Sequence, residues 1–154
     1  MKITPDMISR GYAFAAEFHR TQLDKAGEPY IRHPIRVAFE IAHMGPEYEL
    51  VGLFHDLVED TACTLDDIRE TWGAAVANGV AAITHHQGED YFSEYLPRVM
   101  QNPHARAAKY ADASDNLKRL HQISDAEKRA TMEAKYRQVL DLLSGCQWPP
   151  QYPG

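Results

Sequence analysis

Residues 51–61 read VGLFHDLVEDT, and this stretch decides how the chain is expected to fold. In a helix, Glu59 lies four residues after His55 and three after Asp56, while Asp60 lies four after Asp56. The four polar side chains would therefore share one face, and the apolar residues of the stretch would cover the remainder. The spacing predicts a helix with one polar face and with apolar side chains on all its other sides.

The polar face of this stretch is rich in negative charge. Its three carboxylates within two turns repel one another, by a few tenths of a kcal/mol (~0.2–0.5) per exposed i,i+4 pair. A divalent cation would relieve this repulsion, because imidazole and carboxylate are ordinary metal ligands. On this stretch alone, a solvated helix face is an equally good interpretation.

Helical spacing and helix-start residues recur along the rest of the chain. Thr4-Pro5-Asp6 and Thr64-Leu65-Asp66-Asp67 have the composition of helix N-termini. We expect helices over residues 5–19, 34–44, 48–59, 65–73, 74–85, 89–100 and 103–120, and a last one from a capping box at 124–127 to about 145. No stretch has the period of a strand. The sequence predicts an all-α bundle formed by residues 1–145, followed by a proline-rich tail, 146–154.

Length and composition narrow the class of protein. The 154 residues fit one domain, and the net charge of −6 argues against a surface that coats nucleic acid. The two cysteines form no CxxC motif, which favours a reducing compartment. No apolar run approaches the roughly 20 residues that span a bilayer. We therefore expect a cytoplasmic protein without nucleic-acid or membrane partners, and its oligomeric state, a homo-oligomer included, stays open.

Two further residues extend the polar set. His33 directly precedes Pro34, where a helix is expected to start, and Asp112 lies midway along an alanine-rich helix. A lone acid on such a helix needs a partner. The chain thus presents a histidine, then a His-Asp pair, then an aspartate, each on a different predicted helix.

This order is the ligand arrangement of the HD superfamily of metal-dependent phosphohydrolases. Within it, the strings GEPYIRHP (27–34), FHDLVEDT (54–61) and KYADASDNL (109–117) resemble the hydrolase domain of RelA/SpoT-type alarmone enzymes. The resemblance covers about residues 13–120, and the short single-domain hydrolases share a final helix. It implies an HD-type helical bundle with a metal site between helices.

The resemblance also implies roles for individual residues. One divalent metal ion per chain, typically Mn²⁺ in the family, would be held by His33, His55, Asp56 and Asp112. Glu59 and Asp60 would be the catalytic acid pair. The implied substrate contacts are Lys25, Asn116 and Tyr136.

The implied activity is removal of the 3′-diphosphate from a (p)ppGpp-type nucleotide, a small-molecule substrate. Other nucleotide phosphohydrolases, such as a phosphatase of a nicotinamide dinucleotide phosphate, are the alternative within enzymes. A catalytically silent nucleotide-binding regulatory module is the alternative outside them. The intact pair Glu59-Asp60 favours an enzyme, because a binder needs no proton-transfer pair.

One departure from the family concerns the base. Where the bifunctional enzymes carry an arginine before the matching lysine, this chain has Asp24-Lys25. A carboxylate only accepts hydrogen bonds, whereas a guanidinium donates them and stacks on a purine. We therefore expect weaker discrimination for guanine, with adenine alarmones, (p)ppApp, accepted at least comparably.

Overall fold

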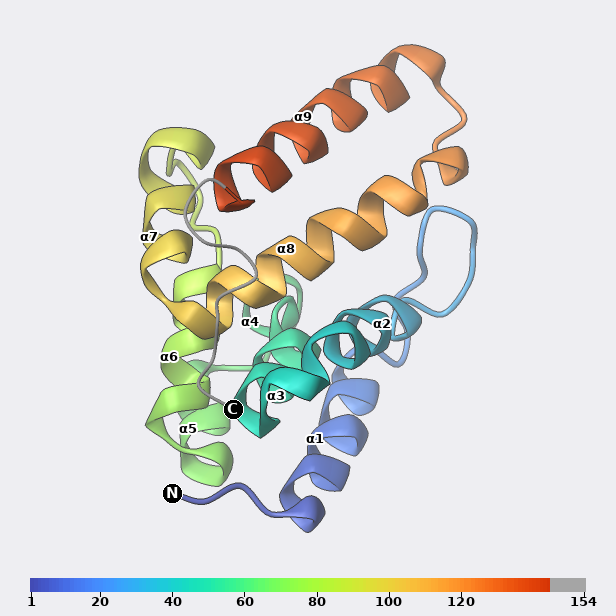
Figure 1. The fold of residues 1–154 in the computed structure, drawn as a ribbon. Coiled ribbons are helices and arrows are strands. Elements are labelled where there is room, and N and C mark those ends of the chain that lie inside the picture. Colours follow the sequence, from blue (N-terminus) through green and yellow to red (C-terminus); the bar gives the residue numbers. More distant parts are fainter. Residues whose placement is uncertain (145–154) are drawn as a thin grey trace.

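The computed structural model describes residues 1–144, which form helices around a buried centre (Figure 1). The predicted tail, 146–154, lies outside the described residues. The α-helices are α1 Pro5–Phe18, α2 Arg32–Ile41, α3 Pro46–Phe54, α4 Leu57–Asp60, α5 Leu65–Trp72, α6 Ala74–Ile83, α7 Leu96–Gln101, α8 Pro103–Lys118 and α9 Ala126–Ser144. Across residues 1–144 the only β pairing is a single bridge between Leu23 and Pro29, so the all-α prediction is confirmed. No helix in the described part is long and apolar enough to cross a membrane.

The first predicted helix starts are confirmed by their hydrogen bonds. Thr4 accepts from the backbone N–H of Met7 at 3.2 Å, and Pro5 occupies the first turn of α1. At α5, Thr64 Oγ1 accepts from the Asp67 backbone N–H at 3.2 Å, and Asp67 accepts from the Thr64 N–H at 2.9 Å. These reciprocal bonds satisfy amides that would otherwise have no partner at a helix N-terminus.

Two predicted starts differ in the structure. The last helix is capped by Asp125, whose Oδ1 accepts from the N–H groups of Glu127 and Lys128 at 2.9 and 3.0 Å, so Ser124 does not head a capping box. The helix expected over 89–100 begins as a π-helical turn, Tyr91–Tyr95, before α7. There the side chain of Asp90 accepts from Ser93 N at 2.8 Å and fixes the wider turn.

The helix expected over 48–59 is wrong as a single helix. It ends as α3 at Phe54 and resumes as α4 at Leu57, with the His-Asp pair in the turn between them. The side chain explains the break, because Nδ1 of His55 lies 2.7 Å from the carbonyl oxygen of Gly52. That carbonyl would otherwise accept from the backbone of the next turn.

Helix α3 is the centre of the bundle. It packs against α1, α2, α6 and α8. A helix that is apolar on all sides is expected to be enclosed by other helices in this way. Its buried residues are Tyr48, Leu50, Val51, Gly52, Leu53 and Phe54. Because α3 ends at the His-Asp pair, the core of the protein fixes where this pair lies.

Gly52 lets α2 and α3 approach closely. A Cβ at this position would lie 3.0 Å from Cδ1 of Ile41, 3.2 Å from Cα of Ala38 and 3.3 Å from its backbone nitrogen. Two of these atoms belong to backbone and cannot rotate away. The close approach therefore holds α2, which carries His33, against the end of α3.

We expect Gly52→Ala to lower the free energy of unfolding by about 1–3 kcal/mol, because the added methyl group overpacks the helix contact. Replacing a glycine within a helix by alanine usually raises the free energy of unfolding, by about 0.5–1 kcal/mol, so a decrease would be the opposite of the usual effect. Urea unfolding followed by circular dichroism measures it. The comparison variant is Gly11→Ala, where the new Cβ would lie 2.7 Å from Cδ2 of Leu50 and 3.3 Å from Cζ of Phe54, so that it meets side chains and no backbone. Equal stability of Gly52→Ala and the wild type would contradict the close-contact interpretation.

Candidate metal centre and its cavities

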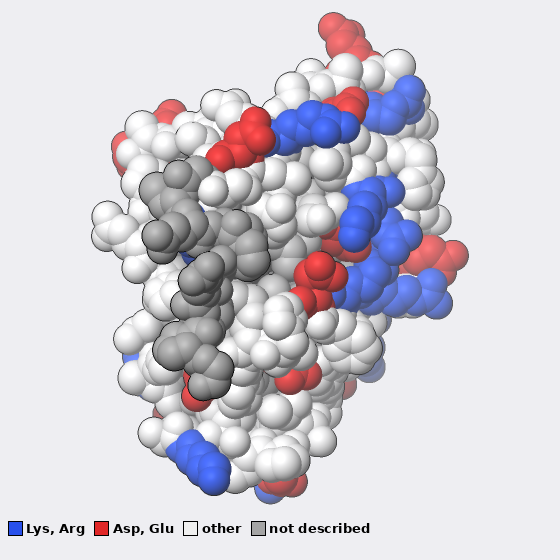
Figure 2. All heavy atoms as spheres, viewed as in Figure 1, with Lys and Arg blue, Asp and Glu red and all other residues white. Residues whose placement is uncertain are grey.

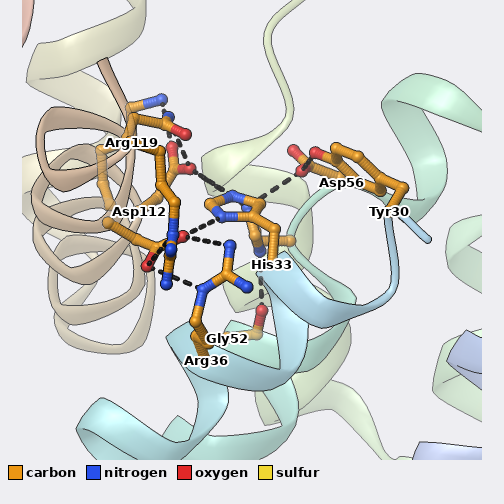
Figure 3. Close-up of polar contacts among 11 residues, drawn as sticks. Tyr30, His33, Arg36, Gly52, Asp56, Asp112 and Arg119 are labelled. Atoms are coloured by element: carbon orange, nitrogen blue, oxygen red, sulfur yellow. Dashed lines mark hydrogen bonds and ion pairs between the residues drawn. The ribbon is translucent and has the colours of Figure 1, made fainter. Parts of the chain in front are cut away.

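Three side chains from separate parts of the fold meet in one cluster. His33 comes from α2, His55 from the turn after α3, and Asp112 from α8. One ligand atom of each lies within 4.8 Å of the others, and the residues are 7%, 3% and 6% exposed. Figure 3 shows Asp112 on one side of His33 and Asp56 on the other. The sequence order His, His-Asp, Asp is thus brought to one place.

The distances within the cluster are those of direct polar contact. Asp112 Oδ1 is 2.8 Å from His33 Nε2 and 3.4 Å from His55 Nε2. Asp56 Oδ2 is 3.0 Å from His55 Nε2, and it accepts a short hydrogen bond from the hydroxyl of Tyr30. Asp56 therefore lies at the edge of the cluster, held by a tyrosine from the loop before α2.

The donor set fits a divalent metal ion. His55 Nδ1 must carry a proton to donate to the Gly52 carbonyl, so in neutral imidazole the lone pair is on Nε2. That nitrogen is buried, makes no well-directed hydrogen bond to the described residues, and faces the carboxylates of Asp56 and Asp112. Lone pairs converging on one point are what a cation satisfies.

Electrostatics supports the same conclusion. Burial lowers the pKa of His55, but the adjacent Asp56 and Asp112 raise it well above its usual value. Carboxylates that stabilise a proton on this ring also stabilise a metal ion in its place, and the two compete. The cluster is able to bind a metal.

A further carboxylate lies behind His33. Asp115 Oδ2 is 2.8 Å from His33 Nδ1, on the ring edge away from Asp112. Arg36 binds both oxygens of Asp115, through Nε and Nη2, each at 2.9 Å. Burial raises the pKa of Asp115, but the hydrogen bonds from His33 and Arg36 outweigh this and hold it at about 2. The ionised carboxylate fixes the orientation of the ring.

Glu59 and Asp60 lie beside the cluster on α4. Glu59 Oε1 accepts from the backbone N–H of His85 at 2.8 Å. Partial burial and the negative charge of Asp56 raise the pKa of both carboxyl groups. Carboxyl groups shifted in this direction are suited to taking up and releasing protons nearer neutral pH.

Two cavities meet at the cluster. The first, of about 440 Å³, contains the cluster together with Glu59 and Asp60. The second, of about 260 Å³, lies between the loop after α1, the C-terminal end of α8 and α9. Four residues line both: Tyr30, His33, Asn116 and Tyr136. The two cavities therefore adjoin at these four side chains, beside the cluster.

The predicted substrate contacts are distributed over these cavities. Asn116 donates to Asp112 Oδ1 at 3.1 Å and, like Tyr136, borders both cavities. Lys25 is exposed and lines the second cavity only. Asp24 lines it too, but its Oδ1 accepts from two amides of its own loop, each at 2.9 Å.

Sequence reasoning missed Asp115, Arg36 and Tyr30. The spacing held a usable pattern, because Asp115 lies three residues after Asp112 and Arg36 three after His33. Residues three apart on a helix lie on the same side of it. If His33 on one helix faces Asp112 on another, Arg36 and Asp115 are therefore expected to face each other as well. Tyr30 gives no such pattern, since it lies in a loop.

Basic side chains gather near the second cavity. Figure 2 shows Lys and Arg on the side of the molecule where α2 and the C-terminal end of α8 meet. Arg36, Lys118 and Arg119 line a surface hollow there. Glu40 and Asp115 line the same hollow, and Arg36 and Arg119 are directed at Asp115, so charges of both signs are mixed on this side.

The fold and cluster define an all-helical protein with a buried histidine-aspartate cluster that is able to bind a metal. The sequence profile of the family described as "HD domain" matches residues 11–143, and the chain belongs to this family. A guanosine-3′,5′-bis(diphosphate) 3′-pyrophosphohydrolase of Aquifex aeolicus is 34% identical over 132 residues, which are 79% of this chain and 19% of that protein. The chain thus spans about a fifth of the length of such curated relatives.

Two solved structures resemble this one. A metazoan orthologue of SpoT, described as hydrolysing ppGpp, superposes with a TM-score of 0.83 at 23% identity, covering 96% of this chain and 91% of the other. The protein lmo0812 of Listeria monocytogenes gives a TM-score of 0.61 at 30% identity, covering 80% and 87%. The predicted RelA/SpoT-type resemblance and HD-type fold are confirmed.

We expect Asp115→Asn to weaken binding of Mn²⁺ by about 10- to 100-fold, the usual effect of removing a partner that orients a ligating histidine. The asparagine side chain is neutral and has one oxygen, so it cannot accept both of the hydrogen bonds that Arg36 donates to the carboxylate of Asp115. Titration calorimetry measures the affinity, with Asp66→Asn as control, because Asp66 is an exposed acid that pairs with its helix neighbour Arg69. An Asp115→Asn protein that binds Mn²⁺ as tightly as the wild type would contradict this role.

Proposed function

We propose that this chain is a metal-dependent hydrolase that removes the 3′-diphosphate from (p)ppGpp-type alarmones, releasing pyrophosphate and the 5′-nucleotide. The observation that carries the proposal is the junction of the two cavities. One contains the metal-binding cluster and the acid pair, and the other provides room beside it for a nucleoside. The names of the curated relatives support the same reaction.

The proposed metal ligands are His33, His55, Asp56 and Asp112, with Mn²⁺ as the ion. A bound divalent ion lowers the pKa of a coordinated water and draws charge from phosphoryl oxygens. The chain supplies the orientation of the ligands. Asp115 holds the ring of His33, Gly52 holds that of His55, and Tyr30 holds the carboxylate of Asp56.

Glu59 and Asp60 are the proposed proton-handling pair. Both line the cavity of the cluster, and both have a raised pKa. One group, as the carboxylate, can take the proton of the attacking water, and the other, as the protonated acid, can give its proton to the leaving ribose oxygen. The backbone N–H of His85 keeps the carboxylate of Glu59 in place.

The nucleoside is proposed to occupy the second cavity. Asn116 and Tyr136, which border both cavities, would contact the sugar and the adjoining phosphate, and Lys25 would lie near the base. Arg36 and Arg119 also line this cavity, but both are directed at Asp115. Asp24 keeps Oδ2 to accept from an exocyclic amine. This supports the predicted weak preference for guanine, with (p)ppApp as a further substrate.

The proposed reaction is tested by incubating the Mn²⁺-loaded protein with ppGpp, pppGpp, ppApp and NADPH and identifying the products by chromatography. We expect pyrophosphate from the alarmones, with kcat/KM values for ppGpp and ppApp within about tenfold, because an accepting carboxylate can bind the exocyclic amine of either base. A contact made to one base alone, worth about 1–3 kcal/mol, would separate the values by about 5- to 150-fold. Phosphate from NADPH alone would replace the proposal with a different phosphohydrolase. Nucleotide binding without turnover would indicate a regulatory module.

Substitutions of the proposed metal ligands and of the acid pair should have different effects on metal content. Asp112→Ala should lose both metal content, measured by elemental analysis, and activity. Glu59→Gln and Asp60→Asn should keep the metal and lose about 10²- to 10⁴-fold in kcat, the range for general acid-base groups. Full metal occupancy in Asp112→Ala would show that the ligand set is wrong. Near-normal turnover in both amide variants would reject proton handling.

A further inference from the structure

Two lysines enter the cavity of the metal cluster around one aromatic ring. Lys109 comes from α8 and Lys135 from α9, which packs along α8 (Figure 1). The ammonium nitrogen of Lys135 lies 4.1 Å from the centre of the Tyr91 ring, and that of Lys109 lies 5.5 Å from it. The ring therefore holds two positive charges in one cavity.

The two lysines differ in how their charges are balanced. Lys109 Nζ is 3.1 Å from Asp112 Oδ2, so it is paired with the cluster. Lys135 lies over the Tyr91 ring and has no ion pair or hydrogen bond to any of residues 1–144. A half-buried ammonium group held near a second cation, with no carboxylate of its own, is a binding position for an anion.

The position of Lys135 selects the kind of anion. Lys109 contacts the cluster directly, whereas Lys135 meets the same Tyr91 ring without an ion pair to the cluster in the described residues. Glu59 and Asp60 line the same cavity and disfavour an anion close to α4. An anion with two phosphoryl groups can place one at the cluster and the other between the lysines, whereas a monophosphate reaches only one of these places.

We propose that Lys135, together with Lys109, binds the terminal phosphate of a diphosphate whose first phosphoryl group lies at the metal cluster. This inference rests on the proposed function and extends it. It makes the cavity selective for a 3′-diphosphate over a 3′-monophosphate. Tyr91 is the positioning residue, because its ring holds both ammonium groups.

The test compares Lys135→Met with Lys128→Met, a matched change at an exposed lysine on the same helix. Binding of inorganic pyrophosphate and of orthophosphate to the Mn²⁺-loaded protein is measured by titration calorimetry. We expect Lys135→Met to weaken pyrophosphate binding by about 10- to 100-fold, the effect of losing a hydrogen bond to a charged group. Orthophosphate binding should change by less than about threefold, the uncertainty of such single-contact values. Lys128→Met should resemble the wild type, and Lys135→Arg should retain most of the affinity.

Hydrolysis gives the second readout. The ratio of kcat/KM for ppGpp to that for the same nucleotide with a 3′-monophosphate should fall in Lys135→Met. Unchanged pyrophosphate affinity in Lys135→Met would overturn the inference, and a lowered melting temperature with that unchanged affinity would assign Lys135 to packing on Tyr91. Pyrophosphate binding that depends on Lys135 in a protein without alarmone hydrolysis would support the anion site and reject the proposed function.

Discussion

The contact on which the structure depends is that of His33 with two carboxylates of α8. Its Nε2 lies 2.8 Å from Asp112 and its Nδ1 lies 2.8 Å from Asp115, so one ring joins α2 to two successive turns of α8. Buried groups of this kind are costly unless every polar atom has a partner. Arg36 and Lys109 supply the opposite charges. The centre of the bundle is thus closed by a polar network, and that network forms one wall of both cavities.

The break between α3 and α4 is the second constraint. In one continuous helix, the pairs His55-Asp56 and Glu59-Asp60 would lie along a single straight face. Instead, the side chain of His55 bonds to the carbonyl of Gly52, and the pair lies in a turn. All four polar side chains still line the same cavity. The turn places His55 and Asp56 at the cluster, while α4 holds the exposed Glu59 and Asp60 at the wall of the same cavity.

The sequence predicted much of the fold because the relevant information is local. Helix starts at Thr4 and Thr64 depend on side chains within three residues, and the apolar spacing of the helices depends on neighbouring turns. The break at His55 was not predictable from that spacing, since it depends on a side chain competing with backbone. The grouping of His33, His55 and Asp112 depends on packing between distant helices. Only the family resemblance, and not the residues alone, brought it into the prediction.

We propose that His33, His55, Asp56 and Asp112 hold one divalent ion where the two cavities adjoin. Crystals grown with Mn²⁺, with data collected at the manganese absorption edge, test it most directly. We expect one anomalous peak per chain, bonded to His33, His55, Asp56 and Asp112. A map without a peak at this cluster, or with its strongest peak at another group of side chains, would contradict it.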